Sequence, residues 1–118
     1  MTVSPEPASA PPVTRAVVQD VLLGPPLAVT RIQTRRITMA PDVAGGPHVH
    51  NGPVVGVIEA GSATMAVDGG PETVLTAGDV FYEPGETVID RFDAGPDGVT
   101  FVAHFPVTDG VEPELRPI

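Results

Sequence analysis

Residues 45–53 read GGPHVHNGP, and this short stretch decides how the rest of the sequence is interpreted. It holds two of the three histidines of the chain, separated by one valine and enclosed by glycine and proline. Side chains at i and i+2 of an extended segment lie on the same face. His48 and His50 can therefore direct two imidazoles at one point, and imidazole is the commonest nitrogen ligand for divalent transition metals. A surface loop with two incidental histidines is the alternative.

The rest of the chain has the composition of a β-protein. Its 118 residues are enough for one domain with a sizeable core. The 15 prolines and 13 glycines disfavour helices and suit tight turns. The short β-branched runs between them predict about eight strands, at residues 16–23, 28–40, 54–59, 62–68, 72–76, 80–83, 87–92 and 99–107. This pattern predicts an all-β single domain, either a barrel or a double-sheet jelly roll.

Charge and composition exclude several classes of function. Fifteen acidic residues against six basic ones give a net charge of -9, which repels nucleic-acid phosphates and anionic lipids, so we expect neither as a partner. No apolar run approaches the roughly 20 residues of a membrane span. The N-terminus has neither the basic start nor the apolar stretch of a secretory signal, so we expect a cytoplasmic protein. The absence of cysteine excludes disulfides and thiolate ligands.

The chain divides into three parts by composition. Residues 1–15 are rich in proline, alanine and serine, which predicts a flexible tail or an arm that docks on a neighbour. Residues 16–110 hold the expected strands and form the barrel domain. Residues 111–118 are polar and interrupted by proline, so we expect a C-terminal tail.

Over roughly residues 28–107 the sequence resembles the cupin superfamily. The stretch GGPHVHNGPVVGVIEAG is similar to the first cupin motif, which has an H-x-H pair, an acidic ligand a few residues on and a closing glycine, here Gly61. The stretch AGDVFYEPGETVID is similar to the second motif, with Gly78, Asp79 and Pro84 in register. The resemblance implies a cupin-like jelly-roll β-barrel with an apolar pocket. In many cupins three histidines and a glutamate hold a metal there.

Two positions depart from the cupin ligand set. The acidic ligand falls at Val54, and the histidine of the second motif falls at Ile89. Both are apolar and cannot bind a metal, although the resemblance implies that both positions face the pocket. The best third partner for His48 and His50 is then His104, in VTFVAHFPV. Strand alternation leaves both orientations of His104 open, since either face of this strand suits the interior of a barrel with a pocket.

Other polar residues near the second motif are further pocket candidates. Glu83 is either a pocket carboxylate or a solvated carboxylate at a strand end. Tyr82 is either a ligand contact or a half-buried packing residue, and Arg91 is either a contact to an anionic ligand or a surface charge. Arg35 and Arg36 are adjacent on a strand, so one of them points inward or lies at a rim.

These observations leave three hypotheses for the function. The first is a small-molecule enzyme of the cupin type, with His48 and His50 as catalytic residues. It would use a divalent metal (Mn, Fe, Ni or Zn) in lyase, isomerase, cyclase or dioxygenase chemistry. The second is a metal-free enzyme in which a histidine acts as general acid or base. The third is a non-catalytic domain that binds a small molecule. The resemblance and the expected exposed strand edges also predict a homodimer.

Overall fold

The computed structural model describes residues 11–118, which contain strands and no helix. The seven strands are β1 (Arg31–Met39), β2 (His48–His50), β3 (Val54–Val67), β4 (Thr73–Thr76), β5 (Val80–Glu83), β6 (Val88–Val107) and β7 (Leu115–Pro117). All pairings are antiparallel. The prediction of an all-β fold is confirmed.

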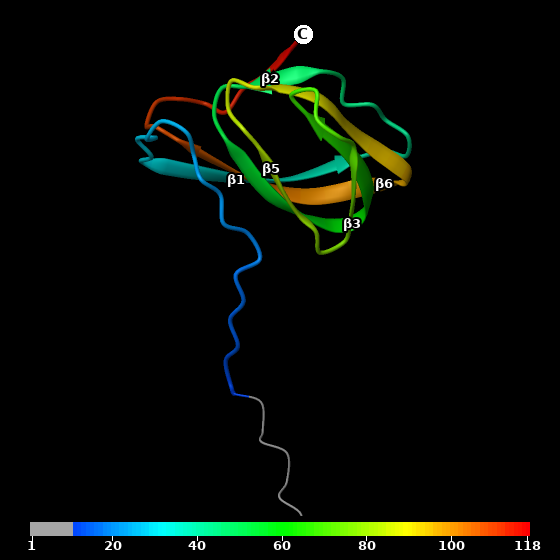
Figure 1. The fold of residues 1–118 in the computed structure, drawn as a ribbon, viewed down its shortest axis with the longest axis horizontal. Helices are drawn as coiled ribbons and strands as arrows, with labels where there is room; N and C mark the ends of the chain where they lie inside the picture. Colours follow the sequence, from blue (N-terminus) through cyan, green and yellow to red (C-terminus); the bar gives the residue numbers. More distant parts are fainter. Residues whose placement is uncertain (1–10) are drawn as a thin grey trace, which may run out of the picture.

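Two long strands, β3 and β6, form the frame of the barrel. They pair with each other over most of their length. The order of the strands in the sheet is β4-β3-β6-β2-β7. The second half of β6 also pairs with β1, and the first half of β3 pairs with β5. Both strands curve, so that each contributes to two facing walls (Figure 1). The result is the predicted jelly-roll barrel.

The curvature requires irregular pairing at the corner between the two walls. The register of β3 against β6 shifts between Ile58 and Ala60 and again between Gly61 and Ala63, as β-bulges do. Gly61 has a φ of 75°, and a Cβ atom at this position would collide with the carbonyl oxygen of Gly98. The corner glycine of the first motif is therefore required by backbone contact. Because β3 and β6 continue through these corners, the strands expected at residues 54–59 and 62–68 both fall in β3. Those expected at 87–92 and 99–107 both fall in β6.

The core lies between the two walls and is built on aromatic rings. Phe92 packs against Phe101 with ring centroids 4.9 Å apart, and Phe81 lies 5.2 Å from Phe92. Edge-on and tilted contacts of this kind add about 0.5–1.5 kcal/mol each to the gain from burial. Ile58 and Ile89 are almost completely inaccessible to solvent. The three phenylalanine rings also line the space beside β2, where the site lies.

Two expectations about the ends of the chain need correction. Residues 16–23 form no strand, although their β-branched sequence predicts one, because no strand within residues 11–118 pairs with their backbone. The C-terminal segment, expected as a tail, contains β7. Of the predicted N-terminal tail, residues 1–10 lie outside the described part, and residues 11–15 have no regular secondary structure. No helix in residues 11–118 has the length and apolar character needed to cross a membrane.

Candidate metal centre

The two histidines of the HVH stretch lie on β2 inside the barrel. β2 pairs with β6 on one side and with β7 on the other, so both of its edges are covered. His48 is 4% exposed and His50 is 8% exposed. Their rings contact each other edge to face, with centroids 4.9 Å apart. The extended backbone of β2 thus brings the two imidazoles to one point.

A carboxylate from β5 joins them. Glu83 is 4% exposed, and its Oε2 atom lies 2.5 Å from Nε2 of His50 and 3.5 Å from Nε2 of His48. The three side chains each offer one ligand atom, and these atoms lie within 4.8 Å of one another. Among the described residues, His48, His50 and Glu83 form the one group of this kind.

The protonation of His48 follows from its second contact. Its Nδ1 atom lies 2.8 Å from the backbone carbonyl of Gly46, and a carbonyl can only accept, so Nδ1 carries the hydrogen. In the neutral ring, Nε2 is then a lone pair that faces the Glu83 carboxylate. Glu83 Oε2 is buried and has no partner with hydrogen-bond geometry within residues 11–118. Because two lone pairs cannot bond to each other, an attractive contact between His48 Nε2 and Glu83 Oε2 requires a proton or a metal cation between them.

The electrostatics of the cluster agree with this requirement. The contact with the Glu83 carboxylate raises the pKa of His48, although burial opposes this, and the bond to Gly46 adds to it. Burial raises the pKa of Glu83, but the two imidazoles more than offset it, so its pKa lies below the ordinary 4.5. The carboxylate is therefore an anion at neutral pH, and its surroundings favour a positive charge beside it.

The cluster forms the polar end of a cavity of about 170 Å³. A cavity of roughly 150 Å³ in another protein holds benzene, so the space suits a molecule of that size. Apart from Gly45 and the three polar residues, the lining is entirely apolar, from Ile37, Met39, Val54, Phe81, Phe92, Phe101, Ala103, Phe105 and Leu115. An apolar pocket with a few convergent polar groups is the usual form of a small-molecule site.

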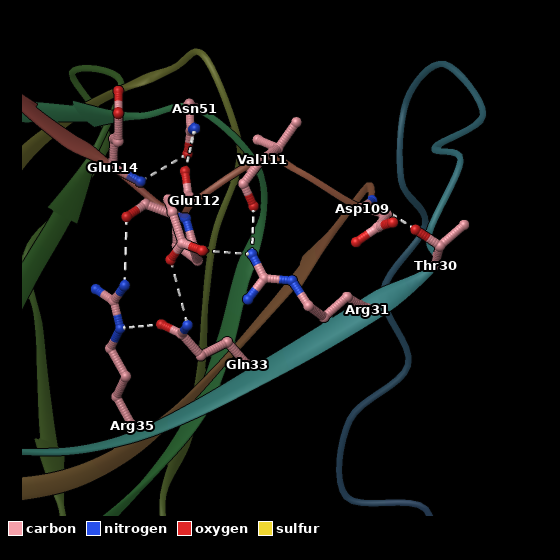
Figure 2. A network of polar contacts seen from close by, with 10 residues as sticks. Thr30, Arg31, Gln33, Arg35, Asn51, Asp109, Val111, Glu112 and Glu114 are labelled. Carbon is pink, nitrogen blue, oxygen red and sulfur yellow. Dashed lines mark hydrogen bonds and ion pairs between the residues drawn. The ribbon is translucent and has the colours of Figure 1, made fainter.

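The C-terminal segment closes this end of the barrel. Leu115 of β7 pairs with His50 and lines the cavity. Figure 2 shows the polar contacts that fasten the segment. Arg31 donates to the Val111 carbonyl and to Glu112, and Asn51 exchanges hydrogen bonds with the backbone of Glu112 and Glu114. The segment predicted to be a tail is therefore a wall of the site.

The two apolar positions of the cupin motifs lie beside the cluster. Val54 pairs directly with Glu83 and lines the cavity. Ile89 pairs directly with His48, so the two side chains share a face, but Ile89 has no exposed surface and is absent from the cavity lining. Ile89 is a core residue that adjoins the site.

Four of the predicted site residues do not line the cavity, namely Ile89, His104, Tyr82 and Arg91. His104 is on the outer face of β6, because Ala103 and Phe105 occupy the inner face, and its Nδ1 atom lies 2.8 Å from Thr34 Oγ1. The structure therefore replaces His104 with Glu83 as the third residue of the cluster.

Tyr82 and Arg91 are corrected in the same way. Tyr82 is on the outer face of β5, in a surface groove beside the N-terminal segment Leu23–Leu27. The Arg91 side chain is 42% exposed and forms ion pairs with Asp93 and Glu72 at 2.5 and 2.7 Å. Neither residue lines the cavity, because strand alternation turns both away from it.

The arginine pair divides as the sequence predicts. Arg36 faces outward and pairs with Glu59. Arg35 is half-buried at the rim, where its guanidinium carbon lies 4.7 Å from the centre of the Phe105 ring and its Nη2 donates to the Pro113 carbonyl. Arg35 therefore helps to hold the C-terminal segment over the cavity.

Glu83 is the site residue whose importance the sequence reasoning underestimated. A signal for it exists in the sequence. In VFYE, Phe81 is the obvious core residue, and alternation places Glu83 on the same inner face. A carboxylate in that position is buried, and a buried carboxylate needs a cationic partner.

The fold and this cluster together define the class of protein. The family model for the cupin domain matches residues 35–88, which include the first motif, the second motif up to Val88 and all three residues of the cluster. The match covers just under half of the chain and, together with the fold, supports its resemblance to the cupin superfamily.

Solved structures with the same fold include several enzymes. An oxalate oxidase superposes with a TM-score of 0.62 at 20% identity, over 74% of this chain and 46% of its own. The DMSP lyase DddQ from Ruegeria pomeroyi gives 0.62 at 17% identity, over 70% and 42%. An RmlC-like cupin from Shewanella frigidimarina gives 0.57 at 25% identity, over 67% and 68%. This chain thus spans less than half the length of the two enzymes. No curated protein matches the chain by sequence.

Proposed function

We propose that the protein is a metal-dependent enzyme that acts on a small molecule in the barrel cavity. The observation that carries the proposal is the buried cluster of His48, His50 and Glu83. Its three ligand atoms converge, and one of them, Glu83 Oε2, lacks any other partner among the described residues. Two histidines and one carboxylate are a common ligand set for Zn²⁺ and for non-haem Fe²⁺.

The residues present fit a divalent metal in three respects. The Nδ1–H of His48 donates to the Gly46 carbonyl, which orients Nε2 for ligation, as such hydrogen bonds do at known metal sites. The anionic Glu83 supplies one negative charge. Burial behind apolar walls excludes water that would compete for the ligand atoms. The donor set is compatible with Mn, Fe, Ni or Zn.

Each part of the site has a role in this proposal. A divalent metal would supply Lewis acidity, and three protein ligands leave positions open for a substrate. His48, His50 and Glu83 hold the charge at one end of the cavity. The aromatic walls bind the apolar part of the substrate and orient its polar group toward the cluster. Leu115 of the C-terminal segment forms part of the cavity wall.

The size and polarity of the cavity indicate the substrate class. About 170 Å³ of largely apolar space suits a compact molecule with one polar or charged group. The oxalate oxidase and the DMSP lyase that share the fold are named for small substrates, which supports this class. Lyase, isomerase, cyclase and dioxygenase reactions all remain within the proposal.

A metal-free enzyme is the second candidate, and one observation favours it. His48 Nε2 lies 3.5 Å from Glu83 Oε2, and the raised pKa of His48 favours a proton between the two groups. Such a pair could transfer a proton to or from a substrate in the cavity. A non-catalytic domain that binds a small molecule is the third candidate.

The first experiment separates the metal enzyme from the other two candidates. Chelator-treated protein is titrated with Mn²⁺, Ni²⁺ and Zn²⁺ by calorimetry, together with Glu83→Gln and the control Glu86→Gln. Glu86 is exposed and pairs with Arg116, so its substitution removes the same charge outside the site. The proposal expects one metal per chain in wild type and in Glu86→Gln, with affinity at least about tenfold lower in Glu83→Gln. Equal binding by all three proteins would refute it.

The remaining expectations extend the same proposal. Location in the cytoplasm and the lack of nucleic-acid or membrane partners stay predictions from charge and composition. The division into a tail, a barrel and a second tail also stays a prediction, with the refinement that the last segment contributes β7. The homodimer likewise stays a prediction from the resemblance and the exposed strand edges.

A further inference from the structure

Arg35 carries a positive charge at the rim of the cavity, and no acidic side chain forms an ion pair with it within residues 11–118. The ion pairs between arginines and acids in this part of the chain involve Arg31, Arg36, Arg91 and Arg116. The chain has 15 acidic residues against six basic ones, so an acid could readily have been placed beside Arg35. The unpaired guanidinium at this position therefore calls for a function.

The strand β1 places Arg35 on the same face as the cavity. Ile37 is two residues further along β1, so it shares that face, and it lines the cavity. Ala103 is the direct partner of Arg35 on β6 and also lines the cavity. Side chains of directly paired residues point to the same side of the sheet. Arg35 thus begins on the cavity face, one position nearer the rim than Ile37.

The contacts of the guanidinium are all with neutral groups. Its Cζ atom lies 4.7 Å from the centre of the Phe105 ring, and Phe105 lines the cavity. Its Nε donates to Gln33 at 2.6 Å, and its Nη2 donates to the Pro113 carbonyl at 3.3 Å. Figure 2 shows the Gln33 amide between Arg35 and the carboxylate of Glu112.

Several donors of Arg35 are left for a ligand. A guanidinium has five N–H donors, and within residues 11–118 Arg35 uses two of them, one on Nε and one on Nη2. Both donors of Nη1 and one of Nη2 are free. A planar carboxylate can accept two parallel N–H bonds from such a fork. A cation at the rim also offsets, locally, the repulsion that a chain of net charge -9 exerts on an anion.

We propose that Arg35 binds a carboxylate of the substrate and thereby makes the cavity specific for small carboxylic acids with an apolar body. This inference rests on the proposed function and adds one group to the substrate class given there. The His50 ring lies 6.2 Å from the Phe105 ring, which Arg35 also contacts. A compact molecule packed against Phe105 can therefore direct its carboxylate to Arg35 and its reacting group to the cluster.

Calorimetric titration with matched acids and amides tests this role. The probes are benzoate with benzamide and isobutyrate with isobutyramide, which differ within each pair only in the charged group. Wild type is expected to bind at least one acid about tenfold or more tightly than its amide, as for hydrogen bonds to a charged group. Arg35→Met should bring the two affinities within about twofold, and Arg35→Lys, which keeps the charge, should retain part of the preference.

The control variant is Arg36→Met. It removes the same charge from the neighbouring residue, which faces outward and pairs with Glu59, so the preference for the acid should persist. Arg35 also contacts Pro113, but a purely structural role would weaken acid and amide alike and leave their ratio unchanged. Absence of a preference in wild type, or a preference that Arg35→Met retains, would overturn the proposal.

Titration of the same proteins with Zn²⁺ separates this inference from the proposed function. Arg35 is not part of the cluster, so Arg35→Met should bind the metal as wild type does. The acid and amide titrations are run on both zinc-loaded and chelator-treated protein. A wild type that binds no Zn²⁺ would refute the metal enzyme, and the acid preference of the metal-free protein would still decide the role of Arg35.

Discussion

Val54 and Glu83 are direct cross-strand partners on β3 and β5, and both are buried, at 2% and 4% exposure. The cupin resemblance implies an acidic ligand at the position of Val54. The structure supplies the acid from the opposite position on the neighbouring strand. Side chains that face each other in this way have Cβ atoms about 4.5–5.5 Å apart and point to the same side. The carboxylate is thus displaced by one strand and remains at the site.

Exchanging the two side chains tests whether the displaced carboxylate is a ligand. Glu83→Val alone should lower metal affinity by at least about tenfold, because it removes the anionic ligand. Adding Val54→Glu should restore part of that affinity, since it returns a carboxylate to the same face. Calorimetric titration of the two variants measures both effects. If the double variant binds no better than Glu83→Val, the two positions are not equivalent.

Ile89→His should add a third imidazole to the cluster. Ile89 lies directly opposite His48 and shares its face. We expect higher affinity for Mn²⁺ or Ni²⁺ than in wild type. The metal-free variant should also be less stable, because a polar ring replaces a fully buried apolar side chain. Calorimetry and thermal unfolding with and without metal separate the two effects. Unchanged affinity would show that the new imidazole does not reach the cluster.

His104→Ala should leave metal binding unchanged. Its ring lies on the outer face of β6 and contacts Thr34. The substitution should lower the free energy of unfolding by no more than about 1 kcal/mol, as for other exposed sites. His48→Ala serves as the comparison and should lose the metal. Metal loss in His104→Ala would restore His104 as a ligand and contradict the structure.

Much of the fold could be predicted from local sequence, but little of the pairing could. The Gly/Pro turns and β-branched runs are local signals, and they gave the β-class and most strand positions. The spacing of His48 and His50 also predicts that they share a face, whereas their inward direction was implied only by the cupin resemblance. The role of Glu83 depends on its pairing with Val54, and the outward turn of His104 depends on which face of β6 covers the core. Both are set by contacts between distant strands.

The strand predicted at residues 16–23 illustrates the same limit. The segment has the side chains of a strand, but a strand exists only where another one supplies hydrogen bonds. Within one chain it finds none among the described residues. The strand propensity of residues 16–23 therefore showed that the segment can form a strand, but it did not predict which strand would pair with it.

The stability of the metal-free protein should depend on pH through His48 and Glu83. The raised pKa of His48 stabilises the fold fully below its ordinary value of 6.5, and this is lost as the pH rises through the folded value. The lowered pKa of Glu83 stabilises the fold above its ordinary value of 4.5, and this is lost as the pH falls through the folded value. The pair therefore contributes most between about pH 4.5 and 6.5.

Urea unfolding of wild type and Glu83→Gln across this range measures the contribution. The difference in free energy of unfolding should be largest between these two values and should shrink on both sides. A difference that grows steadily toward alkaline pH would mean that His48 is not the partner. In the metal-loaded protein the affinity should instead fall with acidification, because protonated imidazole cannot ligate.

X-ray absorption spectroscopy of the zinc-loaded protein tests the central claim most directly, since it reports the ligands of the metal. The account predicts two imidazole nitrogens at about 2.0–2.1 Å and a carboxylate oxygen at about 2.0–2.2 Å. In Glu83→Gln the carboxylate ligand should be lost. A spectrum with no imidazole contribution, or one identical in wild type and Glu83→Gln, would show that His48, His50 and Glu83 do not hold the metal together.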